Sequence, residues 1–246
     1  MIISTSAIVL RTLDYSESSK IATLLTPDHG KIGVIVKGAR KPKSKYAGYF
    51  ETGNILDVVL YIKPTRSVQN LNEVAFRSKN WNIRQDFTKL AVVLAIIEML
   101  DGLVHEYESA NEIYELAETM INWINETSED MVNVFPYILV RLADSSGFGL
   151  QLGEDIHPNN KQSGYLNVED GSVTNDPGVG LSFKLSDFQF DYLKSAIGTK
   201  KSDMFRNGIT KNEIKMLIHH LDVYLKHHIE GLRDRRSDLI FEQILQ

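Results

Sequence analysis

The first third of the chain alternates hydrophobic and polar residues in short runs, whereas the remainder follows helical spacing. Alternation is typical of strands, because successive side chains point to opposite faces. In the first run, one face would carry Ala7, Val9, Arg11 and Leu13, and the other Ile8 and Leu10. The pattern predicts five strands, at residues 7–13, 20–26, 31–37, 54–61 and 68–76.

The connections between these runs are short, polar and marked by Gly and Pro. Pro27-Asp28-His29-Gly30 predicts a tight turn, because Pro fixes one backbone angle and Gly accepts a positive φ. Five short strands within about 75 residues match the size of an OB-type barrel. Such barrels bind single-stranded nucleic acid on one face and on their loops.

The spacing becomes helical after Trp81. We expect helices at residues 86–108, 111–125, 131–145, 186–197 and 210–229, with a last stretch at 235–245. The centre of the first, residues 90–103, is apolar nearly all round, which is typical of a helix buried in a bundle. Thr210 and Glu213 form a capping-box pattern at a helix start. Pro136 is expected to tilt or delay the start of its helix.

Glycines and prolines interrupt the helical pattern at residues 149–183. Residues 165–168 and 172–174 flank Glu169-Asp170-Gly171, which predicts a tight β-hairpin. The expected fold class is therefore α+β, with an N-terminal five-stranded OB-type β-barrel at 1–80 and an α-helical domain at 81–246. A small inserted β-hairpin lobe at 149–183 would interrupt the helical domain.

Composition narrows the class of protein. Hydrophobic residues make up 43% and charged residues 24% of the 246 residues, as in soluble globular proteins. The longest apolar stretch is shorter than the ~20 residues of a membrane span, and no signal peptide is evident. We therefore expect a cytoplasmic protein with no membrane partner. The chain has no cysteine, which excludes disulfides, thiol catalysis and thiolate zinc sites.

Charge is distributed unevenly along the chain. Residues 1–80 hold 12 Lys and Arg against 6 Asp and Glu, whereas the remainder holds 15 against 26. The densest positive run comprises Lys37, Arg40, Lys41, Lys43 and Lys45. Polyanion binding is the simplest reason for such a run in an acidic protein. The alternative is a solvated surface loop without a ligand.

Two neighbouring groups of residues extend this hypothesis. Tyr46, Tyr49 and Phe50 follow the basic run, and they either stack on bases or belong to the barrel core. Near the end of the chain lies a second basic group, which either stabilises the C-terminal end of a helix or adds phosphate contacts. Its members are Arg233, Arg235 and Arg236.

The sequence offers little for catalysis. His219, His220, His227 and His228 share one predicted helix, but the His-Glu-x-x-His spacing is missing. These histidines are expected at the polar boundary of that helix, and a metal-dependent hydrolase is the weakest alternative. No phosphate-binding glycine loop and no nucleophile elbow occur. We therefore expect a binding protein rather than an enzyme.

Four segments resemble one bacterial family. They are Ala7-Ile8-Val9-Leu10-Arg11, Asp14-Tyr15-Ser16-Glu17, the run from Leu24 to Lys31, and the run from Val36 to Ser44. Together they resemble the N-terminal region of the RecO family of recombination mediators and DNA-repair proteins. The chain length, the helical remainder and the late interruption are also similar to that family.

The resemblance implies a function in DNA repair by the RecF pathway, without covalent chemistry. It implies binding of single- and double-stranded DNA, annealing of complementary strands, and loading of RecA onto strands coated by single-stranded-DNA-binding protein. RecR and the single-stranded-DNA-binding protein would be partners, and the protein would associate with the nucleoid. A general single-strand (RNA) binding protein with a helical interaction domain is the alternative.

The resemblance also assigns site residues. Lys37, Arg40, Lys41, Lys43 and Lys45 would contact DNA, with Arg11, Lys20 and Arg66 as weaker candidates. Many relatives carry four cysteines in the inserted lobe, but residues 149–180 have none here. We therefore expect no zinc and no other cofactor, and a lobe held by its hairpin and by packing onto the helices.

Overall fold

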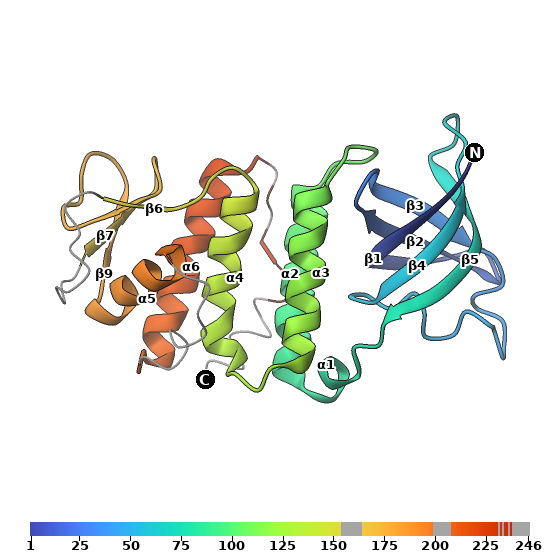
Figure 1. Cartoon of the computed structure of the whole chain (residues 1–246), viewed down its shortest axis with the longest axis horizontal. Coiled ribbons are helices and arrows are strands. Elements are labelled where there is room, and N and C mark those ends of the chain that lie inside the picture. Colours follow the sequence, from blue (N-terminus) through green and yellow to red (C-terminus); the bar gives the residue numbers. More distant parts are fainter. Residues whose placement is uncertain (154–163, 199–207, 231, 233, 236, 238–246) are drawn as a thin grey trace. The chain divides into compact units, whose positions relative to one another are not determined.

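A computed structural model describes residues 1–153, 164–198, 208–230, 232, 234–235 and 237 (Figure 1). The chain divides into two compact units, Met1–Thr127 and Ser128–Gln246. The first unit holds the strands of the barrel and three helices, so it extends well past residue 80.

The N-terminal strands form a closed five-stranded barrel, which confirms the predicted fold. The strands are β1 (Ile2–Tyr15), β2 (Ser19–Thr26), β3 (Gly30–Val36), β4 (Ile55–Tyr61) and β5 (Val68–Ser78). They close in the order β1-β2-β3-β5-β4, with β3 and β5 parallel and the other pairs antiparallel. Aliphatic side chains from β1 to β4 fill the interior, among them Val9, Leu24, Val34 and Leu60.

A β-bulge divides the longest strand, and the prediction of one continuous face was wrong there. Val9 pairs with Leu24, and Arg11 pairs with the next residue, Thr23, so one extra residue lies in β1. A one-residue shift exchanges the two faces of a strand. Ala7 and Val9 accordingly lie in the barrel core, whereas Leu13 is 59% exposed.

Three helices complete the first unit: α1 (Trp81–Gln85), α2 (Phe87–Leu103) and α3 (Asn111–Glu126). Helix α1 was not predicted. Helix α2 begins at Phe87 because the Asp86 carboxylate accepts hydrogen bonds from the backbone N–H groups of Thr88 and Lys89. The hydrogen bond from the Thr88 hydroxyl is the main reason why the pKa of Asp86 lies below its usual value.

Helix α2 ends five residues before the predicted limit at residue 108. The chain then turns toward the barrel, where the backbone N–H of Lys31 donates to the carbonyl of His105 at 3.1 Å. Glu106 forms isolated bridges with Gly30 and Lys31, beside the β2–β3 turn. These backbone bonds replace those that a longer helix would make.

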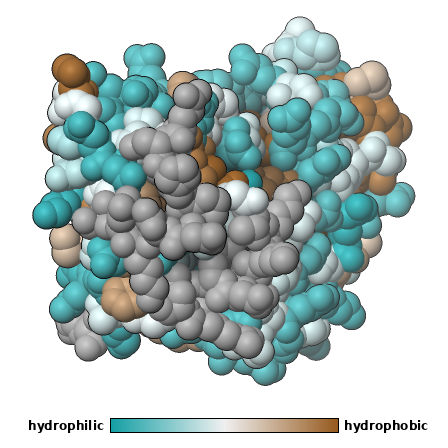
Figure 2. All heavy atoms as spheres, turned by 60° about the vertical axis from the view of Figure 1, so that its left-hand side comes forward, coloured by the Kyte–Doolittle hydropathy of each residue, from teal (hydrophilic) through white to brown (hydrophobic). Residues whose placement is uncertain are grey.

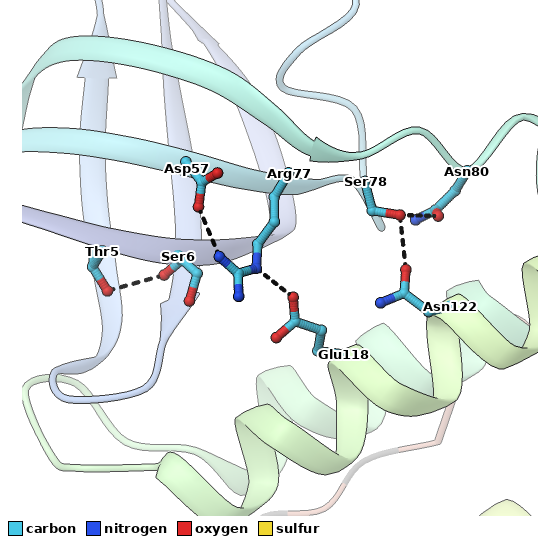
Figure 3. A network of polar contacts seen from close by, with 8 residues as sticks. All are labelled: Thr5, Ser6, Asp57, Arg77, Ser78, Asn80, Glu118 and Asn122. Atoms are coloured by element: carbon cyan, nitrogen blue, oxygen red, sulfur yellow. Dashed lines mark hydrogen bonds and ion pairs between the residues drawn. The ribbon is translucent and has the colours of Figure 1, made fainter.

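A polar network joins the barrel to α3 (Figure 3). The Arg77 guanidinium on β5 donates to Glu118 at 2.6 Å and to Asp57 at 3.1 Å. Its pKa is raised, chiefly by the hydrogen bond to Glu118. The Ser78 hydroxyl lies 2.8 Å from Asn122 Oδ1 on α3. Barrel and helix are therefore linked by directed bonds within the first unit.

The second unit contains α4 (Met131–Ser145), α5 (Asp187–Gly198) and α6 (Lys211–His228). The bounds of α4 match the prediction, and Pro136 does not delay its start. The Thr210–Glu213 capping box at the start of α6 is confirmed. Most of the predicted last helix, residues 235–245, lies outside the described residues.

A tyrosine hydroxyl enters the hydrogen-bond ladder of α4 beside its proline. Tyr192 on α5 donates to the carbonyl of Asn133 at 2.5 Å and accepts from the N–H of Tyr137 at 3.0 Å. These two backbone groups would otherwise pair with each other in a regular helix. Burial raises the pKa of Tyr192, which keeps the hydroxyl protonated.

The inserted lobe is larger than the predicted hairpin. It is a four-stranded sheet in the order β6-β8-β7-β9, and the predicted hairpin forms its β7–β8 pair. The strands are β6 (Gln151–Leu152), β7 (Gly164–Asn167), β8 (Ser172–Thr174) and β9 (Ser182–Leu185).

Polar side chains organise this lobe and attach it to α6. Buried Asn167 accepts from the N–H of Glu169 and donates to the carbonyl of Val179, which joins two loops. From α6, His228 Nε2 lies 2.8 Å from the carbonyl of Val168, and the Tyr224 hydroxyl donates to the carbonyl of Phe148.

Hydrophilic residues cover most of the described surface that is visible in Figure 2, and hydrophobic residues form a few patches. Among the described helices, none has the length and apolar character that crossing a membrane requires.

Candidate nucleic-acid interface

Residues 37–45, here called the basic segment, leave β3 as a series of turns. The N–H of Lys41 donates to the carbonyl of Gly38, and the N–H of Ser44 donates to the carbonyl of Lys41. Gly38 and Lys43 have φ angles of +79° and +60°. A positive φ is unfavourable for residues other than glycine. The hydrogen-bonded turns around Lys43 therefore hold its backbone in this conformation.

Four lysines of the basic segment are exposed: Lys37, Lys41, Lys43 and Lys45. Within the part of the chain that the structure describes, none of them forms an ion pair with a carboxylate. Lys45 Nζ lies 5.0 Å above the ring of Tyr46. Their charges are therefore available to a polyanion.

Arg40 differs from its lysine neighbours, because it fastens the basic segment to the β1–β2 turn. Its Nε lies 3.3 Å from the Asp14 carboxylate, and its Nη1 donates to the carbonyl of Ser16 at 2.7 Å. Its backbone N–H donates to the carbonyl of Ser18. Arg40 positions the segment, and Asp14 offsets part of its charge.

The aromatic residues that follow belong mainly to the end of the barrel. Phe50 is buried in the core, and Tyr49 stacks on Phe76 with ring centroids 4.3 Å apart. Tyr46 meets Phe50 edge to face. These contacts favour the core interpretation over base stacking.

Two residues that sequence reasoning missed hold this part of the interface. The Asn54 amide nitrogen donates to the carbonyls of Gly48 and Tyr49, each at 2.8 Å. Its amide oxygen accepts from Arg84 on α1, which also pairs with Glu51. Since α1 was not predicted, no sequence signal placed Arg84 beside this loop.

The three weaker candidates occupy separate positions on the barrel. Arg11 lies on β1 with its Nε 3.7 Å from Asp101, and its side chain is 58% exposed. Lys20 is half-buried on β2. Arg66 is exposed in the β4–β5 loop, where buried Gln69 donates to its backbone carbonyl at 2.7 Å. Of these three residues, only Lys20 directly follows the β1–β2 turn, to which Arg40 binds.

The C-terminal arginines differ from what the sequence suggested. Arg233 and Arg236 lie outside the described residues. Arg235 is buried, and its two Nη atoms donate to both oxygens of Asp222 at 2.6 and 2.5 Å. Its guanidinium lies 5.1 Å from the ring centroid of Phe135. Arg235 therefore serves the interior of its unit rather than an open phosphate-binding surface.

The histidines of α6 do not form a metal centre. In the part of the chain that the structure covers, no three side chains of His, Asp or Glu converge on a common point. His220 is buried rather than at the polar boundary, and it stacks on Phe183 at 4.2 Å. Burial lowers its pKa to about 4. The hydrolase alternative therefore has no site in the described residues.

A closed five-stranded barrel with a cationic segment, followed by helices and an inserted sheet, defines a nucleic-acid-binding class of OB-barrel proteins. Comparison with known proteins identifies the group. The chain belongs to the recombination protein O family: its N-terminal family model matches residues 1–79, and its C-terminal family model matches residues 84–238.

Relatives named DNA repair protein RecO support this assignment. The relative from Chloroherpeton thalassium is 30% identical over 261 aligned residues, which span both chains completely. The relative from Salinibacter ruber is 32% identical over 173 residues, or 70% of this chain and 66% of that protein. For Chlorobium limicola the identity is 32% over 148 residues, covering 60% of this chain and 57% of the relative.

Proposed function

We propose that this protein is a recombination mediator in DNA repair that anneals complementary strands and helps to load RecA onto single strands. The observation that carries the proposal is the set of exposed lysines on the basic segment, positioned by Arg40 and Asn54. Lysines that neutralise phosphates release counterions, which drives binding.

Annealing follows from the same charges. Two strands repel each other through their phosphates, and cations between them screen that repulsion. Pairing of the bases then supplies the specificity, so the protein needs no covalent step, nucleotide hydrolysis or cofactor. The function proposed here is accordingly that of a binding protein and not of an enzyme.

The proposal extends to partners and place of action. The strands would carry single-stranded-DNA-binding protein, and RecR would assist in the RecF pathway. The protein would act in the cytoplasm, at the nucleoid. Membership in the recombination protein O family supports these assignments. A preference for RNA over DNA would instead favour the general single-strand binding alternative.

The test is DNA binding by fluorescence anisotropy across a salt series. The variant Lys41→Ala/Lys43→Ala is expected to bind single strands more weakly and to flatten the slope of log K against log salt by about 1.4, at roughly 0.7 per contact. The control Lys211→Ala/Lys215→Ala removes the same charge from α6 and should keep the wild-type slope.

A strand-annealing assay with the same variants completes the test. Annealing should slow in the basic-segment variant and stay at the wild-type rate in the α6 control. If the wild-type protein binds neither strand form at low salt, the proposed function is wrong. If both variants flatten the slope equally, the DNA lies elsewhere.

A further inference from the structure

A groove with a volume of about 490 Å³ lies on the outer face of the barrel. Its lining comes from three neighbouring strands, β1, β4 and β5, and includes no residue of the basic segment. Val59 lies at its centre, where it pairs with Ser4 on β1 and with Glu73 on β5. Adjacent strands lie about 4.8 Å apart, so the groove is about 10 Å wide. A groove of this width suits a short segment of chain rather than a folded domain.

Two β-bulges shape the β5 side of this groove. The register of β5 against β4 shifts twice, which leaves Asn72 and Arg77 as extra residues on either side of residues 73–76. Bulges increase the local twist and re-aim side chains, and they are frequent beside functional sites. Figure 3 shows the Arg77 side chain reaching from β5 toward Asp57 on β4 and Glu118 on α3. Helix α3 therefore forms one edge of the groove.

The charged groups of the groove leave an excess of negative charge. Arg77 bonds to one oxygen of each of two carboxylates, Asp57 Oδ1 and Glu118 Oε1. The second oxygen of each carboxylate can therefore accept from another donor. Glu73 is exposed, and it forms no ion pair with a described residue. Three carboxylates against one guanidinium give this group a formal charge of −2.

A buried hydroxyl lies behind the groove. Tyr114 on α3 is 2% exposed, and burial raises its pKa to about 12. Its hydroxyl lies beside Ser6, which lines the groove, but it forms no well-aligned hydrogen bond with a described residue. A buried hydroxyl without a hydrogen bond is unfavourable. The polar groups at this end of the groove are therefore incomplete without a ligand that Ser6 can contact.

The spacing along β4 defines the ligand further. Asp57 and Val59 are two residues apart on one face of this strand, which separates them by about 7 Å. An extended peptide that runs along β4 repeats with the same period, because every second side chain faces the groove. Its groove-facing side chains should therefore alternate, with a cation at Asp57 and an apolar group at Val59.

We infer that this groove binds an extended cationic segment of a partner protein, with Lys or Arg side chains at Asp57 and Glu73 and an apolar side chain at Val59. The inference goes beyond the proposed function, because its ligand is a protein and not DNA. A negative groove repels phosphates, so DNA and the segment would occupy different parts of the barrel. Complementary charge then selects the partner.

The test measures binding of a fluorescein-labelled peptide, Arg-Ser-Val-Ser-Arg-Ser-Val, by anisotropy. The wild type should bind it at low salt, and added salt should weaken binding because exposed charges are screened. Glu73→Lys places a like charge in the groove and should weaken binding by on the order of 10-fold or more. Ala75→Arg fills the groove with a cation from an exposed position on β5 and should have the same effect.

Matched controls separate the groove from general attraction. Glu17→Lys makes the same substitution at an exposed position in the β1–β2 turn, and it should bind the peptide as the wild type does. The basic-segment variant Lys41→Ala/Lys43→Ala should also bind the peptide normally, so a failure of the proposed DNA function leaves this result unchanged. The peptide Arg-Ser-Ser-Ser-Arg-Ser-Ser, which lacks the apolar side chains, should bind more weakly. Spermidine, a polycation without a peptide backbone, should bind much more weakly than the labelled peptide.

Several outcomes would overturn the inference. No binding of the peptide by the wild type at low salt would remove its basis. Equal weakening by Glu73→Lys and Glu17→Lys would show general attraction rather than a groove. Spermidine that binds as tightly as the peptide would assign the groove to small cations. Thermal unfolding checks each variant, and Ala75→Arg decides the comparison if Glu73→Lys is unfolded.

Discussion

The lysines of the basic segment and Arg235 of the second unit carry the same charge in opposite surroundings. Lys41 and Lys43 are exposed on turns of the barrel, whereas Arg235 lies buried against Asp222 and Phe135. A hydrated charge can exchange its counterions for phosphates. A buried, bidentate guanidinium cannot leave its partner without leaving a carboxylate unpaired. A dense group of cationic residues therefore indicates polyanion binding only where the fold places no opposite charge nearby.

The largest expected effect comes from breaking the buried pair. Asp222→Ala leaves the Arg235 guanidinium buried without its carboxylate, which should lower the free energy of unfolding by about 3–5 kcal/mol. Urea denaturation followed by circular dichroism measures this loss. DNA affinity under conditions where the variant is folded should equal that of the wild type.

The double variant Asp222→Leu/Arg235→Met is the matched control. It removes both charges and keeps apolar volume in the site, so most of the lost stability should return. If Asp222→Ala is as stable as the wild type, or if it weakens DNA binding while folded, the contrast between the two groups of cations is wrong.

A smaller effect on stability is expected from a change of pH, and it comes from the buried side chain of His220. The pKa of His220 is about 4 in the folded protein, against an ordinary value of 6.5, because burial disfavours the imidazolium. Between these values the unfolded chain binds more protons, so stability falls as the pH is lowered from about 6.5 to about 4. The loss should be on the order of 3 kcal/mol, because one pKa unit corresponds to about 1.4 kcal/mol.

The variant His220→Leu tests the assignment, since it should remove this part of the pH dependence in urea titrations. The carboxylates of Asp86, Asp170 and Glu213 have lowered pKa values. These carboxylates contribute fully to the free energy of unfolding above the ordinary carboxylate pKa, and they lose that contribution only as the pH falls below it. If the free energy of unfolding of His220→Leu still falls with pH above pH 4 as in the wild type, the effect belongs to another group.

The smallest effect concerns Arg40, which is intermediate between the two groups. Asp14→Asn removes the carboxylate that offsets its charge, so Arg40 should act more like its lysine neighbours. The salt slope for single strands should steepen by up to about 0.7. Because this ion pair is exposed, stability should change by less than about 1 kcal/mol.

Glu17→Gln, in the neighbouring β1–β2 turn, is the control for Asp14→Asn. It removes an equal charge from an exposed side chain, so it separates a general change in potential from release of Arg40. Equal steepening in both variants would show that Arg40 was already available to DNA.

Periodicity predicted the parts of the fold that local pattern determines. The five strands and helix α4 follow from alternation and helical spacing, and the start of α6 follows from Thr210 and Glu213. The bulge in β1 was missed because no residue in the run from Val9 to Arg11 marks it. Helix α1 was missed because five residues are too few to establish a period.

The candidate site was predictable only where charge itself was the signal. The lysines of the basic segment stand together in the sequence, so their density was enough to predict an exposed cationic surface. Asn54 holds the loop through the carbonyls of Gly48 and Tyr49, and Arg84 reaches Asn54 only when α1 lies beside that loop. Arg235 is buried because it pairs with Asp222 on α6. This pairing requires the chain to turn back after α6, which the local sequence does not indicate.

The bulge in β1 also bears on how such a barrel changes over generations. One extra residue reverses the sidedness of everything that follows it in the strand, while the residues before it keep their places in the interior. Selection can therefore alter Leu13 and Tyr15 without disturbing Ala7 and Val9. Within one continuous strand, the exposed half and the half that forms the core are free to diverge at different rates.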